Sequence, residues 1–323
     1  MAYCLKFGEA VRSVEQEQEF IFSEAPFPSC HAATLVDRGD AGPLVAWFGG
    51  TREGDPSVAI WAAGRSAAGW SAPRRIADVD GVPCWNPVLH LTAAGEVLLF
   101  YKAGSHPQTW SGFLQRSADG GETWSEPELL PAGILGPIKN KPLELTDGTL
   151  MCGSSVESYK AWGCWVERTP DGARTWSKHG PINIGGHLNG SIQPALVADG
   201  DEHLVMLCRA RGLGHVVRGE SFDGGVGWTA LEPVDLPHNN SGLDAVRLDT
   251  GTTVLVYNHT TRGRTPLNIA VSDDLGRTWS PGPVLEDTAG EFSYPAVIQG
   301  TDGRIHAAYT WNRRRIRYAT LRL

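Results

Sequence analysis

The octapeptide Ser117-Ala-Asp-Gly-Gly-Glu-Thr-Trp124 occurs in four versions along this chain of 323 residues. The other three are Thr169-Pro-Asp-Gly-Ala-Arg-Thr-Trp176, Ser221-Phe-Asp-Gly-Gly-Val-Gly-Trp228 and Ser272-Asp-Asp-Leu-Gly-Arg-Thr-Trp279. A shortened version, Ser66-Ala-Ala-Gly-Trp70, precedes them, and the five tryptophans are separated by 54, 52, 52 and 51 residues. A constant period of about fifty residues is typical of a repeat architecture.

The residue types of the octapeptide indicate a hairpin turn. An Asp side chain accepts hydrogen bonds from the backbone of its own turn, and Gly adopts positive φ without steric cost. The Trp offers a large apolar surface that packs between strands. Two versions depart from the pattern, because Ala173 replaces a Gly and Gly227 replaces the Thr. We therefore expect the octapeptides to have a structural role.

Each repeat carries the same order of short strands around this turn. First strands are expected to begin near Ala33, Pro87, Pro142, Pro194, Asp244 and Pro295. Apolar second strands are expected at 44–48, 97–101, 150–153, 204–208, 254–257 and 305–309. A third strand, such as 58–63 or 267–271, then precedes the octapeptide. Evenly spaced short strands without a helical period predict an all-β protein, and six units of four strands predict a six-bladed β-propeller with antiparallel blades.

The last repeat has only three strands after Tyr294 before the chain ends. We expect an N-terminal strand within Glu17–Phe22 to supply the fourth, which would close the ring and remove a free sheet edge. No linker or low-complexity segment interrupts the repeats, so residues 1–323 are predicted to form a single propeller domain.

Composition narrows the class of function. Hydrophobic residues make up 41% of the chain and charged residues 20%, as in a soluble globular protein. The net charge of −8 argues against nucleic acid or an anionic membrane surface as a partner. The first residues lack the basic and apolar regions of a signal peptide, so a cytoplasmic location is expected. The six cysteines are predicted to be buried reduced thiols, and neither a metal nor a cofactor is expected, while the oligomeric state stays open.

Strand direction sorts the polar residues between the two faces of the ring. First strands start, and second strands end, on one face, whereas the octapeptides lie on the other. The starts bring His31, Asn86, Lys139, Lys141, Gln193, Asp244, Glu291 and Tyr294 to the first face. The ends bring Thr51, Arg52, Glu53, Asp55, Lys102, Arg209, Arg211, Asn258, His259, Trp311 and Arg313. Six blades converge on one axis, which predicts a site for a small ligand there.

The octapeptide, written S-x-D-x-G-x-T-W, resembles the Asp box of sialidases and other BNR-repeat proteins, and the resemblance covers most of the chain. The segments Phe48-Gly-Gly-Thr-Arg-Glu53 and Glu291-Phe-Ser-Tyr-Pro295 are similar to those of sialidase-like BNR proteins. Sialidases hydrolyse a terminal sialic acid with a Tyr nucleophile assisted by a Glu, an Asp acid/base and three arginines that bind the carboxylate. The resemblance implies that Tyr294 is the nucleophile, Asp55 or Glu53 the acid/base, and Arg209 one of the arginines.

Several positions differ from the sialidase pattern. The Arg-Ile-Pro motif of blade one is replaced by Ser29-Cys-His-Ala-Ala33, and the Glu that assists Tyr is replaced by Gln193. The arginine expected in blade five is replaced by Tyr257-Asn-His259, although Arg262 and Arg264 follow it. The chain is therefore expected to be sialidase-like rather than a true sialidase.

The leading functional hypothesis is an exo-acting glycoside hydrolase for a terminal acidic or deoxy sugar of a small oligosaccharide. Asp55 or Glu53 would protonate the leaving oxygen, and Tyr294 would attack or stabilise the oxocarbenium-like centre, with Glu291 and His31 as further catalytic candidates. The expected substrate-binding residues are Arg52, Asn86, Lys102, Lys139, Lys141, Gln193, Arg209, Asp244, Asn258, His259 and Trp311.

Two alternatives stay open. A lyase acting on a uronic acid would use His31, His259 or Tyr294 as the base, with Lys139 and Lys141 neutralising the carboxylate. A propeller that binds glycans without catalysis is the other, because this fold hosts many functions.

Overall fold

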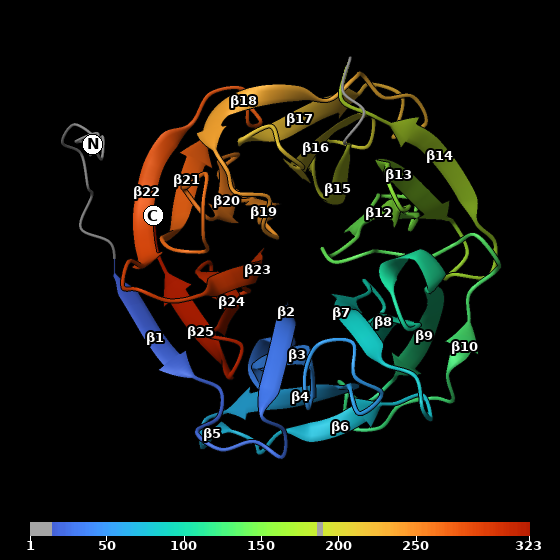
Figure 1. Ribbon diagram of the computed structural model, residues 1–323, viewed down its shortest axis with the longest axis vertical. Coiled ribbons are helices and arrows are strands. Elements are labelled where there is room, and N and C mark those ends of the chain that lie inside the picture. Colours follow the sequence, from blue (N-terminus) through green and yellow to red (C-terminus); the bar gives the residue numbers. More distant parts are fainter. Residues whose placement is uncertain (1–14, 186–189) are drawn as a thin grey trace.

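The computed structural model describes residues 15–185 and 190–323 and contains six antiparallel sheets arranged as blades around one axis (Figure 1). Blade one contains β2 (Ser29–Asp37), β3 (Pro43–Gly50), β4 (Ala59–Ser66), β5 (Gly69–Trp70) and β6 (Arg74–Ala77). Blade two contains β7 (Cys84–Leu91), β8 (Val97–Ala103), β9 (Ser111–Ser117) and β10 (Glu128–Leu129). Blade three contains β11 (Leu143–Glu144), β12 (Leu150–Glu157), β13 (Trp162–Thr169) and β14 (Ser177–Ile182).

The remaining blades complete the ring. Blade four contains β15 (Ser191–Asp199), β16 (His203–Ala210), β17 (His215–Ser221) and β18 (Glu232–Pro237). Blade five contains β19 (Asp244–Arg247), β20 (Thr253–Tyr257), β21 (Leu267–Ser272) and β22 (Ser280–Glu286). Blade six contains β23 (Phe292–Gln299), β24 (Ile305–Trp311), β25 (Arg315–Leu321) and β1 (Gln16–Phe20). The predicted all-β fold and the six blades are confirmed.

Blade six joins the two ends of the described chain. Strand β1 pairs antiparallel with β25, from Gln16 opposite Leu321 to Phe20 opposite Arg317. Figure 1 shows β1 as the outermost strand beside β25. The predicted closure of the ring by an N-terminal strand is therefore confirmed, and the outer edge of β25 is covered.

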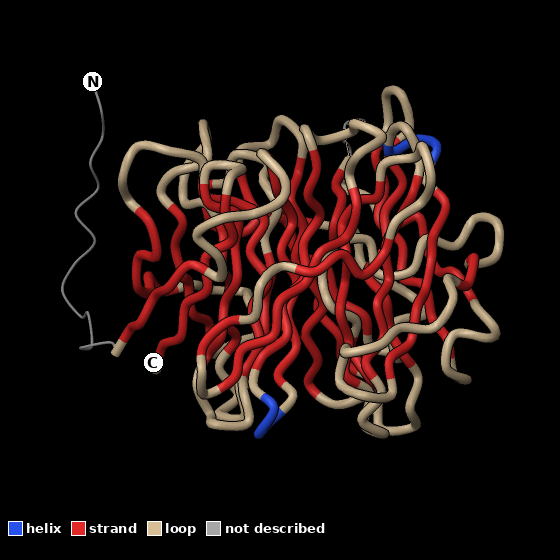
Figure 2. Tube along the Cα trace, turned by 90° about the horizontal axis from the view of Figure 1, so that it is seen from below, coloured by secondary structure: helices blue, strands red, loops and turns tan. Residues whose placement is uncertain are grey.

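The strands run between two faces that carry the loops (Figure 2). The 3-10 turn η1 (Gly39–Ala41) joins β2 to β3, and η2 (Pro107–Thr109) joins β8 to β9. In an antiparallel blade, these two kinds of connection lie on opposite faces. The first-strand starts and second-strand ends therefore share one face, which is the arrangement that brings the candidate site together.

First strands begin earlier than expected in four blades. They start at Ser29, Cys84, Ser191 and Phe292, three or four residues before the predicted positions. The reason is a register shift inside each strand, for example between Ser293 and Ala296, so that pairing begins before an irregular residue and resumes after it. In blade three, the inner strand is only two residues long, because residues 137–141 adopt an irregular path.

The core lies between neighbouring blades rather than in one central mass. One buried cluster combines residues of β2, β3 and β4 with residues of β7 and β8. Trp124 of the first full octapeptide packs against this cluster, and Trp176, Trp228 and Trp279 pack against three others. Each of these four tryptophans therefore contributes apolar area to a buried cluster, as the repeat predicts.

The octapeptide Asp acts as a hydrogen-bond acceptor for its own turn. Asp119 accepts from the Ser117 hydroxyl at 2.7 Å, the Thr123 backbone N–H at 2.9 Å and the Thr123 hydroxyl at 2.6 Å. These hydrogen bonds, those from Thr123 above all, hold the pKa of the Asp119 carboxyl below its usual range. Where Gly227 replaces Thr, Asp223 keeps only the backbone donor of that residue, at 2.8 Å.

Five cysteines are buried and free: Cys30, Cys84, Cys152, Cys164 and Cys208. Cys4, also predicted to be a reduced thiol, lies outside the described residues. Within the described part of the chain, no helix has the length and apolar character needed to cross a membrane.

Gly225→Ala should destabilise the fold more than Gly224→Ala. Both glycines have positive φ, +83° and +69°, so a Cβ costs about 1–2 kcal/mol at either position. At Gly225 the new Cβ would also lie 2.2 Å from Cε of the buried Met151 and 3.1 Å from Leu204, which adds about 1–3 kcal/mol of overpacking. Urea unfolding of both variants measures the difference, and equal midpoints would contradict it.

Asp119→Ala should lower the melting temperature by an amount that depends on pH. Because the pKa of Asp119 is lower in the folded state, its contribution to stability is present above the unfolded pKa, about 3.9. That contribution is lost as the pH falls through the folded pKa. The gap between wild-type and variant melting temperatures should be constant from pH 5 to 8 and should narrow below about pH 4. A gap that widens in acid would contradict this interpretation.

Candidate active site

Lys139 crosses the axis of the ring and forms the floor of the site. Its ammonium Nζ donates to Asn140 Oδ1 at 2.8 Å, to the Leu243 carbonyl at 3.1 Å and to the Pro295 carbonyl. The side chain is 2% exposed, and this burial lowers its pKa to about 7. Three oxygen acceptors favour the ammonium form, which links blade three to blades five and six.

Lys141 and Asp244 form a second link across the ring. Lys141 Nζ lies 3.0 Å from Asp244 Oδ2 and donates to the Ala245 carbonyl at 2.7 Å. Asp244 Oδ2 also accepts from the Val297 backbone N–H at 2.8 Å. Both side chains are thus fully engaged between blades, and they support the floor of the site.

Asn86 and Lys102 support the same floor from blade two. Asn86 Nδ2 donates to the Ile138 carbonyl at 3.3 Å. Lys102 is completely buried and donates to the Asn86 carbonyl at 3.4 Å and to the Pro137 carbonyl. Burial lowers the pKa of Lys102 to about 7. These two residues bind backbone carbonyls, as Lys139 and Lys141 also do.

Four first strands share a backbone irregularity that turns side chains at their starts. Ala32, Asn86, Gln193 and Tyr294 have φ of +58°, +37°, +58° and +52°. Each lies within a register shift of its strand pair. Such bulges redirect side chains, and left-handed backbone is uncommon for residues other than glycine. Tyr294 and Gln193 therefore occupy equivalent positions in different blades.

The Tyr294 hydroxyl lies among hydrogen-bond donors. Its oxygen accepts from Arg209 Nη1 at 2.8 Å and from Gln193 Nε2 at 3.5 Å. Arg209 Nη1 also donates to Gln193 Oε1 at 3.2 Å, which fixes the orientation of the amide. Arg209 Nε donates to Asn240 Oδ1 at 2.8 Å. The tyrosine oxygen thus faces an arginine and an amide at the position where sialidases are expected to place a Glu.

His31 packs against the tyrosine ring and has one unused nitrogen. The two ring centroids are 4.1 Å apart. His31 Nδ1 lies 2.9 Å from Thr310 Oγ1, while its buried Nε2 has no hydrogen-bond partner among the described residues. Burial, followed by repulsion from Arg313 and other cations, holds the pKa of His31 well below its usual value. The imidazole is therefore neutral near pH 7, with Nε2 available to a ligand.

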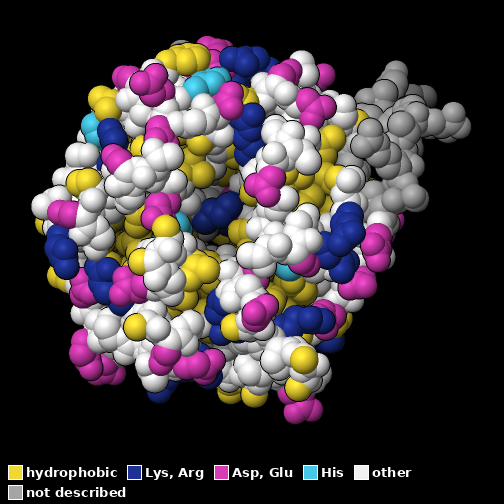
Figure 3. All heavy atoms as spheres, turned by 180° about the vertical axis from the view of Figure 1, so that it is seen from behind, with side chains coloured by type: hydrophobic (Ala, Val, Ile, Leu, Met, Phe, Trp, Pro, Cys, Tyr) yellow, Lys and Arg dark blue, Asp and Glu magenta, His cyan; other side chains and the backbone are white. Residues whose placement is uncertain are grey.

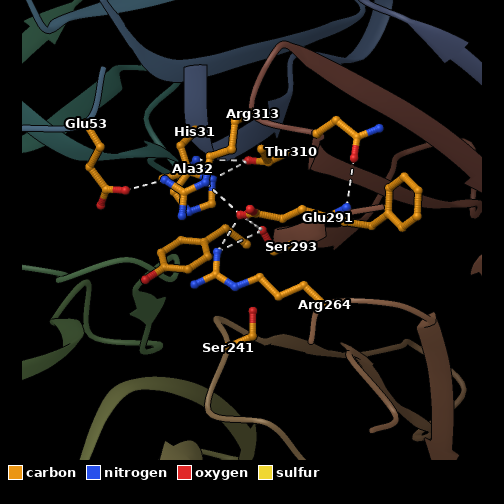
Figure 4. A network of polar contacts seen from close by, with 12 residues as sticks. His31, Ala32, Glu53, Ser241, Arg264, Glu291, Ser293, Thr310 and Arg313 are labelled. Atoms are coloured by element: carbon orange, nitrogen blue, oxygen red, sulfur yellow. Dashed lines mark hydrogen bonds and ion pairs between the residues drawn. The ribbon is translucent and has the colours of Figure 1, made fainter. Parts of the chain in front are cut away.

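Glu291 holds two arginines, Arg264 and Arg313, as Figure 4 shows. Its Oε1 lies 2.7 Å from Arg264 Nη1 and 2.6 Å from Arg313 Nε. Glu53 reaches Arg313 from blade one and pairs with it. Burial acts to raise the pKa of Glu291, but Arg264 and Arg313 outweigh it and keep the pKa below its usual value. Glu291 is thus an ionised group that positions guanidinium groups.

Two guanidinium groups lie near the tyrosine ring, and a third, that of Arg313, shares Glu291 with Arg264. Arg209 belongs to β16, Arg264 to the loop after β20, and Arg313 to the turn between β24 and β25. The Cζ atoms of Arg209 and Arg264 lie 5.8 and 5.5 Å from the Tyr294 ring centroid. Arg313, Arg264, Lys139 and Arg209 all act electrostatically on His31. Arg264 was absent from the sequence-based candidates, because only its loop, and not its direction, could be inferred.

Arg52 and Asp55 lie at the outer edge of the site. The Arg52 side chain is 82% exposed, and its Nε lies 4.0 Å from Asp55 Oδ2. Asp55 accepts hydrogen bonds from the Ser57 backbone at 3.0 Å and hydroxyl at 2.7 Å. Those bonds lower the pKa of Asp55, so it is a carboxylate at neutral pH.

Three other candidates contact strands of blades five and six instead. Trp311 packs edge-on against Phe20 at a centroid distance of 5.3 Å. Asn258 Nδ2 donates to the Phe292 carbonyl at 2.8 Å, and His259 contacts the Tyr257 hydroxyl. Among the described residues, neither Trp311 nor Asn258 forms a ring contact or hydrogen bond with Tyr294.

The described residues contain no group of three or more His, Cys, Asp or Glu side chains that could hold a metal ion. Seen from the side opposite to Figure 1, the ring is hollowed at its centre, and basic side chains lie in the hollow (Figure 3).

Solved structures with the same fold include several sialidases. A Dyadobacter fermentans protein of unknown function has a TM-score of 0.82 at 18% identity, covering 97% of this chain and 100% of that one. A Hadza microbial sialidase has a TM-score of 0.74 at 17% identity, over 90% of this chain and 65% of its own. The NanB sialidase from Streptococcus pneumoniae has a TM-score of 0.75 at 11% identity, over 94% and 70%.

These similarities establish the fold, and the sialidase chains are longer than this one. No curated protein matches the chain in sequence. The BNR repeat-like domain, however, matches residues 43–307, which is most of the chain. The chain thus belongs to the BNR repeat-like family and has the propeller fold of the sialidases.

Proposed function

We propose that this protein is a glycoside hydrolase that removes a terminal acidic sugar from a small oligosaccharide. The observation that carries the proposal is the position of Arg209 and Arg264 beside Tyr294, with Arg313 joined to Arg264 through Glu291. Guanidinium groups bind carboxylates through paired hydrogen bonds, and such bonds are stronger than neutral ones. A sugar carboxylate would thus be held directly beside the tyrosine ring.

Tyr294 is the group placed to act on the anomeric carbon. Its oxygen accepts hydrogen bonds from Arg209 and Gln193, and both donors stabilise negative charge on that oxygen. An oxygen with this character stabilises an oxocarbenium-like centre or attacks it. Glu291 contributes indirectly, since it fixes Arg264 and Arg313.

A β-eliminating lyase for a uronic acid is the second candidate. Two observations favour it: the amide of Gln193 stands beside the Tyr294 hydroxyl, and the neutral His31 offers a free Nε2. In that reaction a base removes the proton next to the carboxylate, and cations stabilise the enolate that forms. The arginine cluster suits this charge as well.

A panel of glycosides separates the candidates. Purified protein is incubated with aryl glycosides and short oligosaccharides that end in sialic acid, uronic acid or a deoxy sugar. The hydrolase predicts released sugar without new absorbance near 235 nm, and acidic sugars should be the preferred ends. A rise in absorbance would support the lyase, because elimination forms an unsaturated uronate. Binding without either signal would support a glycan-binding propeller.

Tyr294→Phe should reduce kcat by about 100-fold or more on the sugar that the panel identifies, since it removes the oxygen held by Arg209. Its melting temperature should stay close to that of the wild type, because the ring contact with His31 is kept. Tyr159→Phe, at a tyrosine that is 89% exposed, serves as the matched control and should retain full activity. Unchanged turnover in Tyr294→Phe would remove this tyrosine from the mechanism.

A further inference from the structure

Glu157 lies on the site face of blade three, at a position that the sequence-based candidates omit. It is the last residue of β12, the second strand of the blade, and such strand ends open on the same face as Tyr294. Glu157 pairs directly with Trp162 in the antiparallel β12–β13 ladder. Side chains of directly opposed residues lie on the same side of a sheet, within about 5 Å at Cβ.

Trp162, the strand neighbour of Glu157, lies near Arg209, which in turn lies near Tyr294. The Arg209 Cζ atom lies 5.9 Å from the Trp162 ring centroid and 5.8 Å from the Tyr294 ring centroid. Arg211 lies over the same tryptophan at 5.2 Å. The Arg209 guanidinium group is therefore near both the Trp162 ring, which neighbours Glu157 in the sheet, and the Tyr294 ring.

The surroundings of Glu157 differ from those of the other site carboxyls. Glu53 pairs with Arg313, Asp55 accepts from Ser57, and Glu291 binds two arginines. Within residues 15–185 and 190–323, the structure gives the Glu157 carboxyl no hydrogen bond or ion pair at contact distance. It is the free carboxyl of the group.

Electrostatics agree with this geometry. Burial raises the pKa of Glu157, the charge of Glu53 acts in the same direction, and Arg209 and Arg211 oppose them without cancelling the rise. Asp55 has its pKa lowered instead. Carboxyls whose pKa values are pushed apart in one site are typical of a proton donor beside an ionised partner.

We infer that Glu157 is the proton donor to the leaving glycosidic oxygen, an assignment that rests on the proposed hydrolase. As the bond between the anomeric carbon and that oxygen breaks, the bonding electron pair stays on oxygen, which takes the Glu157 proton. Water then bonds to the anomeric carbon and returns one proton to the Glu157 carboxylate. The net reaction consumes one water and restores the enzyme.

The test compares two leaving groups on one sugar. Glu157→Gln should lose about 10²- to 10⁴-fold in kcat/KM on the phenyl glycoside of the acidic sugar. On the 2,4-dinitrophenyl glycoside it should lose less than about tenfold, because that leaving group departs without a proton. The decline of activity at high pH should disappear in the variant, and azide should accelerate Glu157→Ala on the dinitrophenyl substrate.

Two further variants make the outcome unambiguous. Glu126→Gln, at an exposed glutamate next to an octapeptide, should match the wild type on both substrates. Asp55→Asn should not show selective loss on the phenyl glycoside. If Asp55→Asn shows that selective loss and Glu157→Gln does not, the donor is Asp55 and the inference is wrong. A wild-type enzyme that releases neither phenol would instead overturn the hydrolase itself, and the donor with it.

Discussion

The ammonium group of Lys139 is the contact on which the centre of this propeller depends. Inner strands of a propeller present backbone groups to the axis, and a buried carbonyl needs a donor. Lys139 supplies donors to the carbonyls of Leu243 and Pro295, in blades five and six, from a segment of blade three that is not a strand. The irregular segment of blade three thus leaves the regular strand path and places Lys139 where it can bind carbonyls of blades five and six.

The same buried polar groups hold the backbone of the residues that line the site. Pro295 follows Tyr294, so the carbonyl that Lys139 binds is adjacent to the residue with positive φ that presents the phenol. Asn140 Nδ2 donates to the Gln193 carbonyl at 3.0 Å, at the equivalent bulge of blade four. A left-handed residue within a strand persists only where its surroundings hold it. Lys139 supports the backbone next to Tyr294, and Asn140 supports the backbone of Gln193.

The sequence predicted the ring, its closure and the polar face, because these depend on periodic features. The tryptophan spacing and the apolar runs indicate where each strand lies. Counting the strands within each repeat then gives the direction of each strand, because neighbouring strands are antiparallel. The bulges at Ala32 and Tyr294 could not be predicted, since neither residue is a type that usually adopts positive φ. The direction of Arg264 was hidden because it lies in a loop. Glu157 was missed because the second strand of blade three was expected to end at residue 153, whereas β12 continues to Glu157.

The positions that differ from the sialidase pattern all concern charged groups near Tyr294. His31 stands where one arginine is expected, Tyr257-Asn-His259 stands where another is expected, and Gln193 stands where a glutamate is expected. Arg264 and Arg313, both held by Glu291, supply positive charge beside these positions. In the proposed hydrolase these guanidinium groups bind the sugar carboxylate, and the tyrosine hydroxyl faces hydrogen-bond donors in place of an acidic partner. In the proposed hydrolase the leaving oxygen also needs a proton donor, and we assign that role to Glu157, whose pKa is raised by burial and whose strand neighbour Trp162 lies against Arg209.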